Sequence, residues 1–232
     1  MNVLVMATHP DDEVLGCGGV MARHADQGDG IHVLVVTRGV PEIFPPSEIE
    51  QTRGELRRAH ELLGVASCRF LDLPAPKLDM VPQCELAQAI SGAVRELQPR
   101  TVYLPHHGDL HIDHRAVYLA SLVAVRPVNA CPVRRVLCYE TLSETDWAPP
   151  RPDQTFVPTV FVDISEHLTR KLEALACYQS QLRPFPNPRS PDAVEALARL
   201  RGSTVGVAAA EAFVLVRQID RSSAAHAEPP SE

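Results

Sequence analysis

A short acidic turn follows directly on a strand-like segment near the start of this chain. Residues 3–7 (VLVMA) are typical of a strand buried on both faces, and residues 8–13 (THPDDE) come next. Pro10 favours the first turn of a helix, where its missing N–H is not needed. Three acidic residues and a histidine at the end of a buried strand are costly unless a positive charge lies there. The fold must therefore place a positive charge, such as a metal ion or a basic side chain, next to this turn.

Spacing separates the acidic residues of the turn into groups. If a helix begins at Pro10, His9 and Asp12 are three residues apart and can converge, whereas Asp11 points elsewhere. His9 and Asp12 could then bind one metal ion, because imidazole nitrogen and carboxylate oxygen are both zinc ligands. Asp11 would be free for proton transfer. The alternative is that these acids only complement the helix dipole, and we assign Glu13 to that role.

Composition restricts the class of protein. The chain has 232 residues, 45% of them hydrophobic, which is enough for one large domain with a sizeable core. A net charge of -7 disfavours nucleic-acid binding, and no apolar segment reaches the roughly 18 residues of a membrane span. The six cysteines form no Cys-x-x-Cys pair, which favours reduced thiols. We expect a soluble cytoplasmic protein with one domain over residues 1–218 and a disordered tail over residues 219–232.

The order of the expected elements indicates an α/β fold. Strand-like runs occur at residues 3–7, 31–37, 68–71, 101–104, 136–140, 160–163 and 213–216. Helical patterns separate the first four of these runs, which predicts right-handed crossovers. We therefore expect a Rossmann-like, mostly parallel sheet with helices on both faces. The site of such a sheet lies beyond the carboxyl ends of its strands, so more metal-binding residues are expected after the fourth strand.

A histidine-rich segment follows that fourth strand. Residues 106–114 (HHGDLHIDH) contain four histidines and two aspartates. His111 and His114 are three residues apart and can face one site, and Asp113 can orient an imidazole. The residues alone do not decide which of these two histidines is the metal ligand. Together with the acidic turn, the segment predicts a metal site made from two distant parts of the chain.

These two motifs resemble those of the LmbE-like, or PIG-L, family of zinc-dependent de-N-acetylases. The matching motifs are HPDDE at residues 9–13 and DLHIDH at residues 109–114. Weaker family features are Thr37-x-Gly39, Arg53 ahead of Leu62, Tyr178 with Ser180-Gln181, Arg201-Gly202 and the segment 210–213. The family's usual alanine before the first histidine is Thr8 here, a change that we expect to be tolerated. The resemblance therefore extends to about residue 217.

The resemblance implies a role for each residue of the two motifs. The implied metal ligands are His9, Asp12 and His114. Asp11 would be the general base, and His111 would stabilise the oxyanion or protonate the leaving amine. Asp113 would orient His111. We further predict that Arg53 and Asp109 contact the substrate.

The resemblance also implies a reaction and a cofactor. Family members remove an acetyl group from molecules that contain N-acetylglucosamine, so we expect a zinc-dependent hydrolase acting on a small N-acetylated sugar. Ferrous iron suits the same ligands as zinc, and relatives often form homo-oligomers. One alternative is a metal-dependent amidase for a sugar–thiol conjugate, and another is a non-catalytic, metal-dependent sugar-binding protein. The presence of Asp11 and His111 favours an enzyme, because binding alone needs neither.

Prolines mark the loops that we expect to form the walls of the site. They cluster at residues 41–46, 74–82, 149–158 and 184–191. Helical spacing alone places Arg53 and Glu55 on a solvated face. His106 and His107 lie outside the family motif, and we expect them at the rim of the pocket or exposed.

Overall fold

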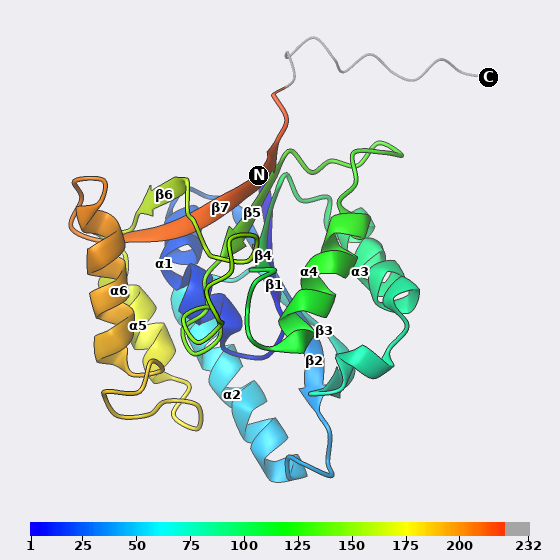
Figure 1. The fold of residues 1–232 in the computed structure, drawn as a ribbon, viewed down its shortest axis with the longest axis horizontal. Coiled ribbons are helices and arrows are strands. Elements are labelled where there is room, and N and C mark those ends of the chain that lie inside the picture. Colours follow the sequence, from blue (N-terminus) through cyan, green and yellow to red (C-terminus); the bar gives the residue numbers. More distant parts are fainter. Residues whose placement is uncertain (221–232) are drawn as a thin grey trace.

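The chain folds into one sheet with helices on both sides, as the computed structural model in Figure 1 shows. The structure describes residues 1–220. The strands are β1 (Asn2–Ala7), β2 (Gly30–Gly39), β3 (Ser67–Ala75), β4 (Thr101–Pro105), β5 (Arg135–Tyr139), β6 (Val160–Asp163) and β7 (Ala210–Gln218). Beyond Asp220, the predicted disordered tail lies outside the described residues.

The sheet has the order β3-β2-β1-β4-β5-β7-β6. The first five strands in this order are parallel, whereas β7 is antiparallel to both β5 and β6. The predicted α/β fold with a mostly parallel, Rossmann-like sheet is therefore confirmed. The antiparallel edge is an addition that the alternation of strands and helices did not reveal.

Two hydrophobic cores cover the two faces of the sheet. The helices are α1 (Asp12–Asp26), α2 (Pro46–Leu63), α3 (Gln83–Leu97), α4 (Ile112–Ala124), α5 (Leu168–Ala176) and α6 (Pro191–Ser203), with the short 3-10 helix η1 (Leu78–Met80). Helices α1, α2, α5 and α6 pack on one face, and α3 and α4 pack on the other (Figure 1). Val3 and Val5 enter the first core and Leu4 and Met6 the second, as the two-residue period of a strand requires.

The strand order reverses at β1, which lies between β2 and β4. The chain leaves β1 into α1 and crosses to β2 on one side, and it later returns through α3 to β4 on the other side. The carboxyl ends of β1 and β4 therefore lie next to each other. Ligands of doubly wound sheets bind at this kind of crevice, and it is here that the acidic turn and the histidine-rich segment meet.

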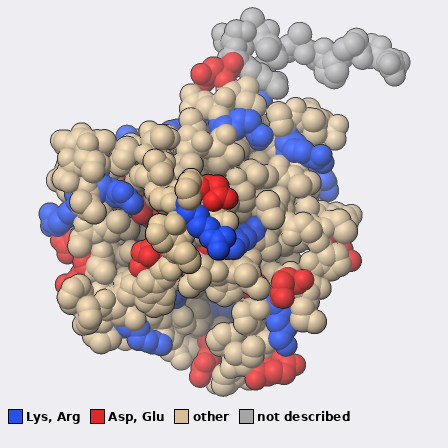
Figure 2. Space-filling view, in the orientation of Figure 1, with Lys and Arg blue, Asp and Glu red and all other residues tan. Residues whose placement is uncertain are grey.

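Charge is mixed on the surface. Basic and acidic side chains are interspersed over the face in Figure 2, without one sign dominating. Within residues 1–220, no helix combines the length and the apolar composition that crossing a membrane requires.

Candidate metal and catalytic site

The acidic turn adopts a backbone that its own side chains stabilise. Helix α1 begins at Asp12 and not at Pro10, because Asp11 takes a left-handed conformation with φ 108°. The carboxylate of Asp12 accepts a hydrogen bond from the backbone N–H of His9 at 2.8 Å. The carboxylate of Glu13 accepts one from the N–H of Asp11 at 3.1 Å. These contacts offset the cost of a non-glycine residue at positive φ.

Glu13 is a buried structural anchor of the turn. Its side chain is fully buried, and Oε1 accepts a hydrogen bond from the hydroxyl of Tyr178 at 2.5 Å and lies 3.0 Å from Nε2 of His60. Glu13 lies in the first turn of α1, as predicted, but it does more than complement the helix dipole, because its carboxylate also contacts Tyr178 and His60. The partners lie on α2 and just after α5, so the turn is tied to both helices.

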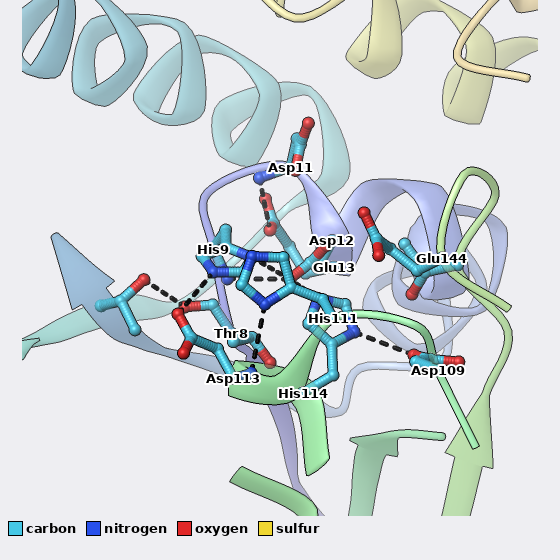
Figure 3. Close-up of polar contacts among 12 residues, drawn as sticks. Thr8, His9, Asp11, Asp12, Glu13, Asp109, His111, Asp113, His114 and Glu144 are labelled. Carbon is cyan, nitrogen blue, oxygen red and sulfur yellow. Dashed lines mark hydrogen bonds and ion pairs between the residues drawn. The ribbon is translucent and has the colours of Figure 1, made fainter. Parts of the chain in front are cut away.

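Three side chains from the two motifs converge at the carboxyl ends of β1 and β4. Nδ1 of His9 lies 3.6 Å from Oδ2 of Asp12, and Nε2 of His114 lies 3.3 Å from the same oxygen (Figure 3). Potential ligand atoms of all three residues lie within 4.8 Å of one another. Within the part of the chain that is described, His114 Nε2 and Asp12 Oδ1 are buried without a hydrogen-bond partner. Two imidazoles and a carboxylate with such unpartnered atoms fit a divalent metal ion.

Asp109 orients His114 through Nδ1, the ring nitrogen that does not face Asp12. Its Oδ2 lies 2.8 Å from Nδ1 of His114, and its Oδ1 accepts a hydrogen bond from the hydroxyl of Thr145 at 2.6 Å. Asp109 is fully buried and does not line the cavity. A carboxylate at this position fixes the ring of His114 and leaves Nε2 directed at Asp12, and the predicted contact of Asp109 with substrate stays a prediction.

Asp113 holds His9 in a corresponding way. One carboxylate oxygen lies 3.3 Å from Nε2 of His9, and the other accepts a hydrogen bond from the N–H of Leu78 at 3.1 Å. Its carboxylate therefore pairs with His9, while its backbone N–H donates to Nδ1 of His111, and the orienting role predicted for Asp113 toward His111 stays a prediction. Both histidines of the proposed ligand set thus have one ring nitrogen near a carboxylate and the other near Asp12.

His111 lies at the N-terminus of α4 and lines the cavity. Its Nδ1 accepts a hydrogen bond from the backbone N–H of Asp113 at 3.1 Å. Burial lowers the pKa of His111, and the neighbouring His9 lowers it further. A neutral ring that accepts at Nδ1 carries its proton on Nε2, so His111 can donate a hydrogen bond into the cavity.

Buried charges shift the titration of the proposed ligands. Burial alone would raise the pKa of Asp12, but the adjacent His114 outweighs it and holds that pKa below its usual range. Burial alone would lower the pKa of His114, but Asp12 and Asp109 together raise it well above its ordinary value. In the absence of a metal ion, the proton on His114 balances the carboxylates. A divalent cation would replace that proton.

Asp11 stands apart from the three proposed ligands (Figure 3). Its Oδ2 accepts a hydrogen bond from Nη1 of Arg189 at 2.6 Å, while Oδ1 has no partner among residues 1–220. Burial raises the pKa of Asp11 to about 8, although Arg189 opposes this shift. Sequence reasoning missed Arg189. The signal was its place in the proline-rich segment 184–191, which was expected to form a wall of the site.

A cavity of about 570 Å³ opens beside these residues. Its wall includes His9, Asp11, His111, Arg53, Glu144 and Arg189. The segments 41–46, 74–82 and 184–191 contribute to it, as predicted, whereas residues 149 and 150 of the remaining proline-rich segment line a second cavity.

Helix α2 contributes two charged side chains that differ in their surroundings. Arg53 lies in the cavity wall, where its guanidinium stacks over Phe70 at 4.4 Å and pairs with Asp72. Its contact with substrate stays a prediction. Glu55 is buried and accepts hydrogen bonds from the N–H and hydroxyl of Ser180, so the expected solvated face is wrong for this residue.

His106 and His107 tether a loop and lie outside the cavity wall. Nε2 of His106 lies 3.0 Å from the carbonyl oxygen of Gln154, and Nε2 of His107 lies 2.8 Å from that of Asp153. His106 is buried. The expectation that these two histidines lie at the pocket rim or are exposed is therefore wrong for His106.

The sequence matches a family model described as PIG-L: GlcNAc-PI de-N-acetylase over residues 4–125, which is more than half of the chain. The chain therefore belongs to the PIG-L family, as its two motifs predicted. The fold agrees, because the structure superposes on the crystal structure of the conserved protein TT1542 from Thermus thermophilus with a TM-score of 0.77 and 30% sequence identity. That superposition covers 97% of this chain and 99% of the other.

Two relatives are named deacetylases. The uncharacterized deacetylase YaiS of Escherichia coli is 32% identical over 185 residues, covering 77% of this chain and 91% of that protein. The 1D-myo-inositol 2-acetamido-2-deoxy-alpha-D-glucopyranoside deacetylase of Kineococcus radiotolerans is 34% identical over 160 residues. This second match covers 53% of this chain and only 44% of the relative, so it spans less than half of that protein.

Proposed function

We propose that this chain is a metal-dependent hydrolase that removes the acetyl group from an N-acetylglucosamine-containing glycoside or conjugate. The observation that carries the proposal is the convergence of His9, Asp12 and His114 at the edge of a cavity that His9, Asp11 and His111 line. The names of the relatives support the substrate class, since one of them is named for an acetamido-deoxy-glucopyranoside. Zinc is the proposed metal, and ferrous iron suits the same ligands.

Amide hydrolysis needs an activated water and stabilisation of a tetrahedral oxyanion. A divalent ion held by His9, Asp12 and His114 would polarise the amide carbonyl and lower the pKa of a nearby water. Asp11 accepts the proton of the attacking water at the oxygen that Arg189 leaves free. The Nε2–H of neutral His111 donates a hydrogen bond to the developing oxyanion. Of the two roles implied for His111, this protonation state favours oxyanion stabilisation.

The proton that Asp11 takes up can then pass to the departing amine nitrogen. Burial raises the affinity of this carboxyl for the proton that it takes from water, and the departing amine, which is a stronger base, can then accept that proton. Burial of Asp11 therefore suits a group that first accepts and then returns one proton. The products are acetate and the free amino sugar.

The size of the cavity supports a small sugar as the substrate. A volume of about 570 Å³ lies within the usual range for small-molecule pockets. Arg53 offers donors for ring hydroxyls on the α2 side of the cavity, and its ion pair with Asp72 restrains the guanidinium. Phe70 beneath the guanidinium limits its motion.

Acetate release from a panel of N-acetylglucosamine derivatives by the zinc-loaded protein tests this proposal. We expect release from at least one derivative, and in Asp11→Asn a kcat lower by ~10²- to 10⁴-fold with zinc content unchanged. Full turnover by Asp11→Asn would exclude Asp11 as the base. Amine release only from cysteinyl-sugar conjugates would favour the alternative amidase, and binding without hydrolysis would favour a sugar-binding protein.

A further inference from the structure

Arg189 reaches the proposed general base from a distant part of the chain. It donates from Nη1 to Oδ2 of Asp11 at 2.6 Å, although the two residues are 178 positions apart. The side chain of Asp11 is 4% exposed and that of Arg189 is 21% exposed. Its other side-chain partners within residues 1–220 are Ser143 and Glu144, and the proposed metal ligands and His111 are not among them, so its contact with Asp11 needs a separate explanation.

The contact makes the two carboxylate oxygens of Asp11 unequal. Oδ2 is occupied by Arg189, whereas Oδ1 is buried and has no hydrogen-bond partner in the described part of the chain. Buried polar atoms are nearly always paired, and an unpaired one in a cavity wall is a candidate for a role in catalysis. Rotation of the carboxylate about its Cβ–Cγ bond would exchange the two oxygens. A fixed arginine prevents this exchange and keeps one oxygen available as proton acceptor.

The guanidinium of Arg189 is itself held at several points. Nε donates to the hydroxyl of Ser143 at 2.9 Å, and Nη2 lies 4.0 Å from a carboxylate oxygen of Glu144. Ser143 is fixed in turn, since its N–H donates to Asp146 at 2.5 Å. A planar guanidinium presents its donors in a rigid fork, so contacts at Nε and Nη1 together set its orientation.

The backbone that presents Arg189 is also constrained. The loop before α6 closes on itself through a hydrogen bond from the N–H of Arg183 to the carbonyl of Arg189 at 3.4 Å. The side chain of Asn187 accepts a hydrogen bond from the N–H of Arg189 at 2.9 Å. Ser190 then caps α6 by accepting from the N–H of Ala193 at 3.1 Å. Three prolines within the loop reduce its freedom further.

We infer that Arg189 is a positioning residue that fixes the Asp11 carboxylate in the orientation required for proton transfer. The inference rests on the proposed function, and it assigns to the proline-rich loop before α6 a part in the reaction. Arg189 acts through Asp11 and does not hold the metal ion. Its loss therefore lowers turnover without loss of metal and with little change in substrate affinity.

Steady-state kinetics of three variants test this role. They are Arg189→Gln, Arg189→Lys, and the double variant that combines Arg189→Gln with Asp11→Asn. With a derivative that the wild type hydrolyses, Arg189→Gln is expected to lower kcat about 100-fold, with KM within about threefold and zinc content unchanged. Arg189→Lys restores only part of the loss, because an ammonium cannot reproduce the fork. Arg199→Gln, which removes an exposed arginine of α6 paired with Glu195, is the matched control and retains wild-type kcat.

The combined variant distinguishes action through Asp11 from a separate effect. In the Asp11→Asn background, Arg189→Gln is expected to change kcat by less than about threefold, since the group it positions is already lost. A further drop of about 100-fold in that background would overturn the inference, as would wild-type kcat in Arg189→Gln. Ser143→Ala, which removes only the acceptor of Nε, is a milder variant. We expect Ser143→Ala to lower kcat by about three- to tenfold, and it serves as the test of the inference if Arg189→Gln does not fold. Wild-type kcat in Ser143→Ala would then overturn the inference.

A crystal structure of Arg189→Gln decides the positioning claim without any activity. The Asp11 carboxylate is expected to have turned from its wild-type orientation, while His9, Asp12 and His114 keep theirs. An unchanged orientation of the Asp11 carboxylate in Arg189→Gln would overturn the inference, whatever the activity of that variant. Absence of acetate release by the wild type would instead reject the proposed function, and the two failures remain distinguishable.

Discussion

Replacing Tyr178 by phenylalanine removes one defined hydrogen bond from the base of the acidic turn. The hydroxyl donates to Oε1 of Glu13 at 2.5 Å, and both residues are fully buried. Among residues 1–220, the partners that Glu13 then keeps are His60 and the N–H of Asp11. A hydrogen bond to a charged group contributes about 1.5–3 kcal/mol, so we expect Tyr178→Phe to lower the free energy of unfolding by about 2 kcal/mol. For a domain of this size that corresponds to a Tm lower by roughly 4–8 °C.

Two other tyrosines supply matched comparisons. The hydroxyl of Tyr139 donates to the neutral carbonyl of Met6 at 2.6 Å, so Tyr139→Phe should cost only about 1 kcal/mol. The hydroxyl of Tyr118 makes no hydrogen bond to any described residue, and Tyr118→Phe should change the free energy of unfolding by less than about 0.5 kcal/mol. All three substitutions remove a tyrosine hydroxyl oxygen. Differences among their changes in unfolding free energy therefore depend on which acceptor, if any, that hydroxyl donates to.

Denaturant unfolding of the four proteins, each in the same metal-loaded state, measures these differences. The expected order of destabilisation is Tyr178→Phe, then Tyr139→Phe, then Tyr118→Phe. Equal stability of Tyr178→Phe and the wild type, within about 0.5 kcal/mol, would refute the argument that this hydroxyl anchors Glu13.

Three further outcomes follow from the site and the core. Asp109→Asn is expected to weaken zinc binding by about 10- to 100-fold in a chelator competition, and unchanged affinity would contradict its role in orienting His114. The raised pKa of His114 means that the metal-free protein carries a proton there, so zinc affinity should rise with pH below that pKa. Calorimetry in buffers of different ionisation enthalpy should detect the released proton, and no buffer dependence would argue against it. Gly16→Ala should destabilise the fold by about 1–3 kcal/mol, because a Cβ there would overlap the ring of Tyr139; unchanged unfolding would show that the ring can move.

Most of the fold could be predicted from local sequence patterns. Each strand of the parallel part of the sheet is a short apolar run between helical patterns, and burial on both faces is why residues such as Leu4 and Val5 are both apolar. The antiparallel placement of β6 and β7 was not predictable in this way. Their pairing depends on where a long connection returns to the sheet, which no local period encodes.

The proposed metal ligands could also be predicted from the sequence, whereas the distant partners of Glu13 and Asp11 could not. His9 and Asp12 lie within one turn, and the fold places the next motif on the neighbouring strand. The partners of Glu13 are 47 and 165 positions away, and the partner of Asp11 is 178 positions away. Contacts of this kind depend on how α2, α5 and the loop before α6 pack around the turn. The sequence could therefore predict which side chains converge at the site, but not the distant residues that hold Glu13 and Asp11 in place.

Anomalous diffraction at the zinc edge from crystals of the zinc-loaded protein tests the central claim most directly. We predict one strong peak in contact with His9, Asp12 and His114, and its disappearance in His114→Ala together with the loss of acetate release. A zinc peak elsewhere in the chain, or a fully occupied peak at the same place in His114→Ala, would contradict the account.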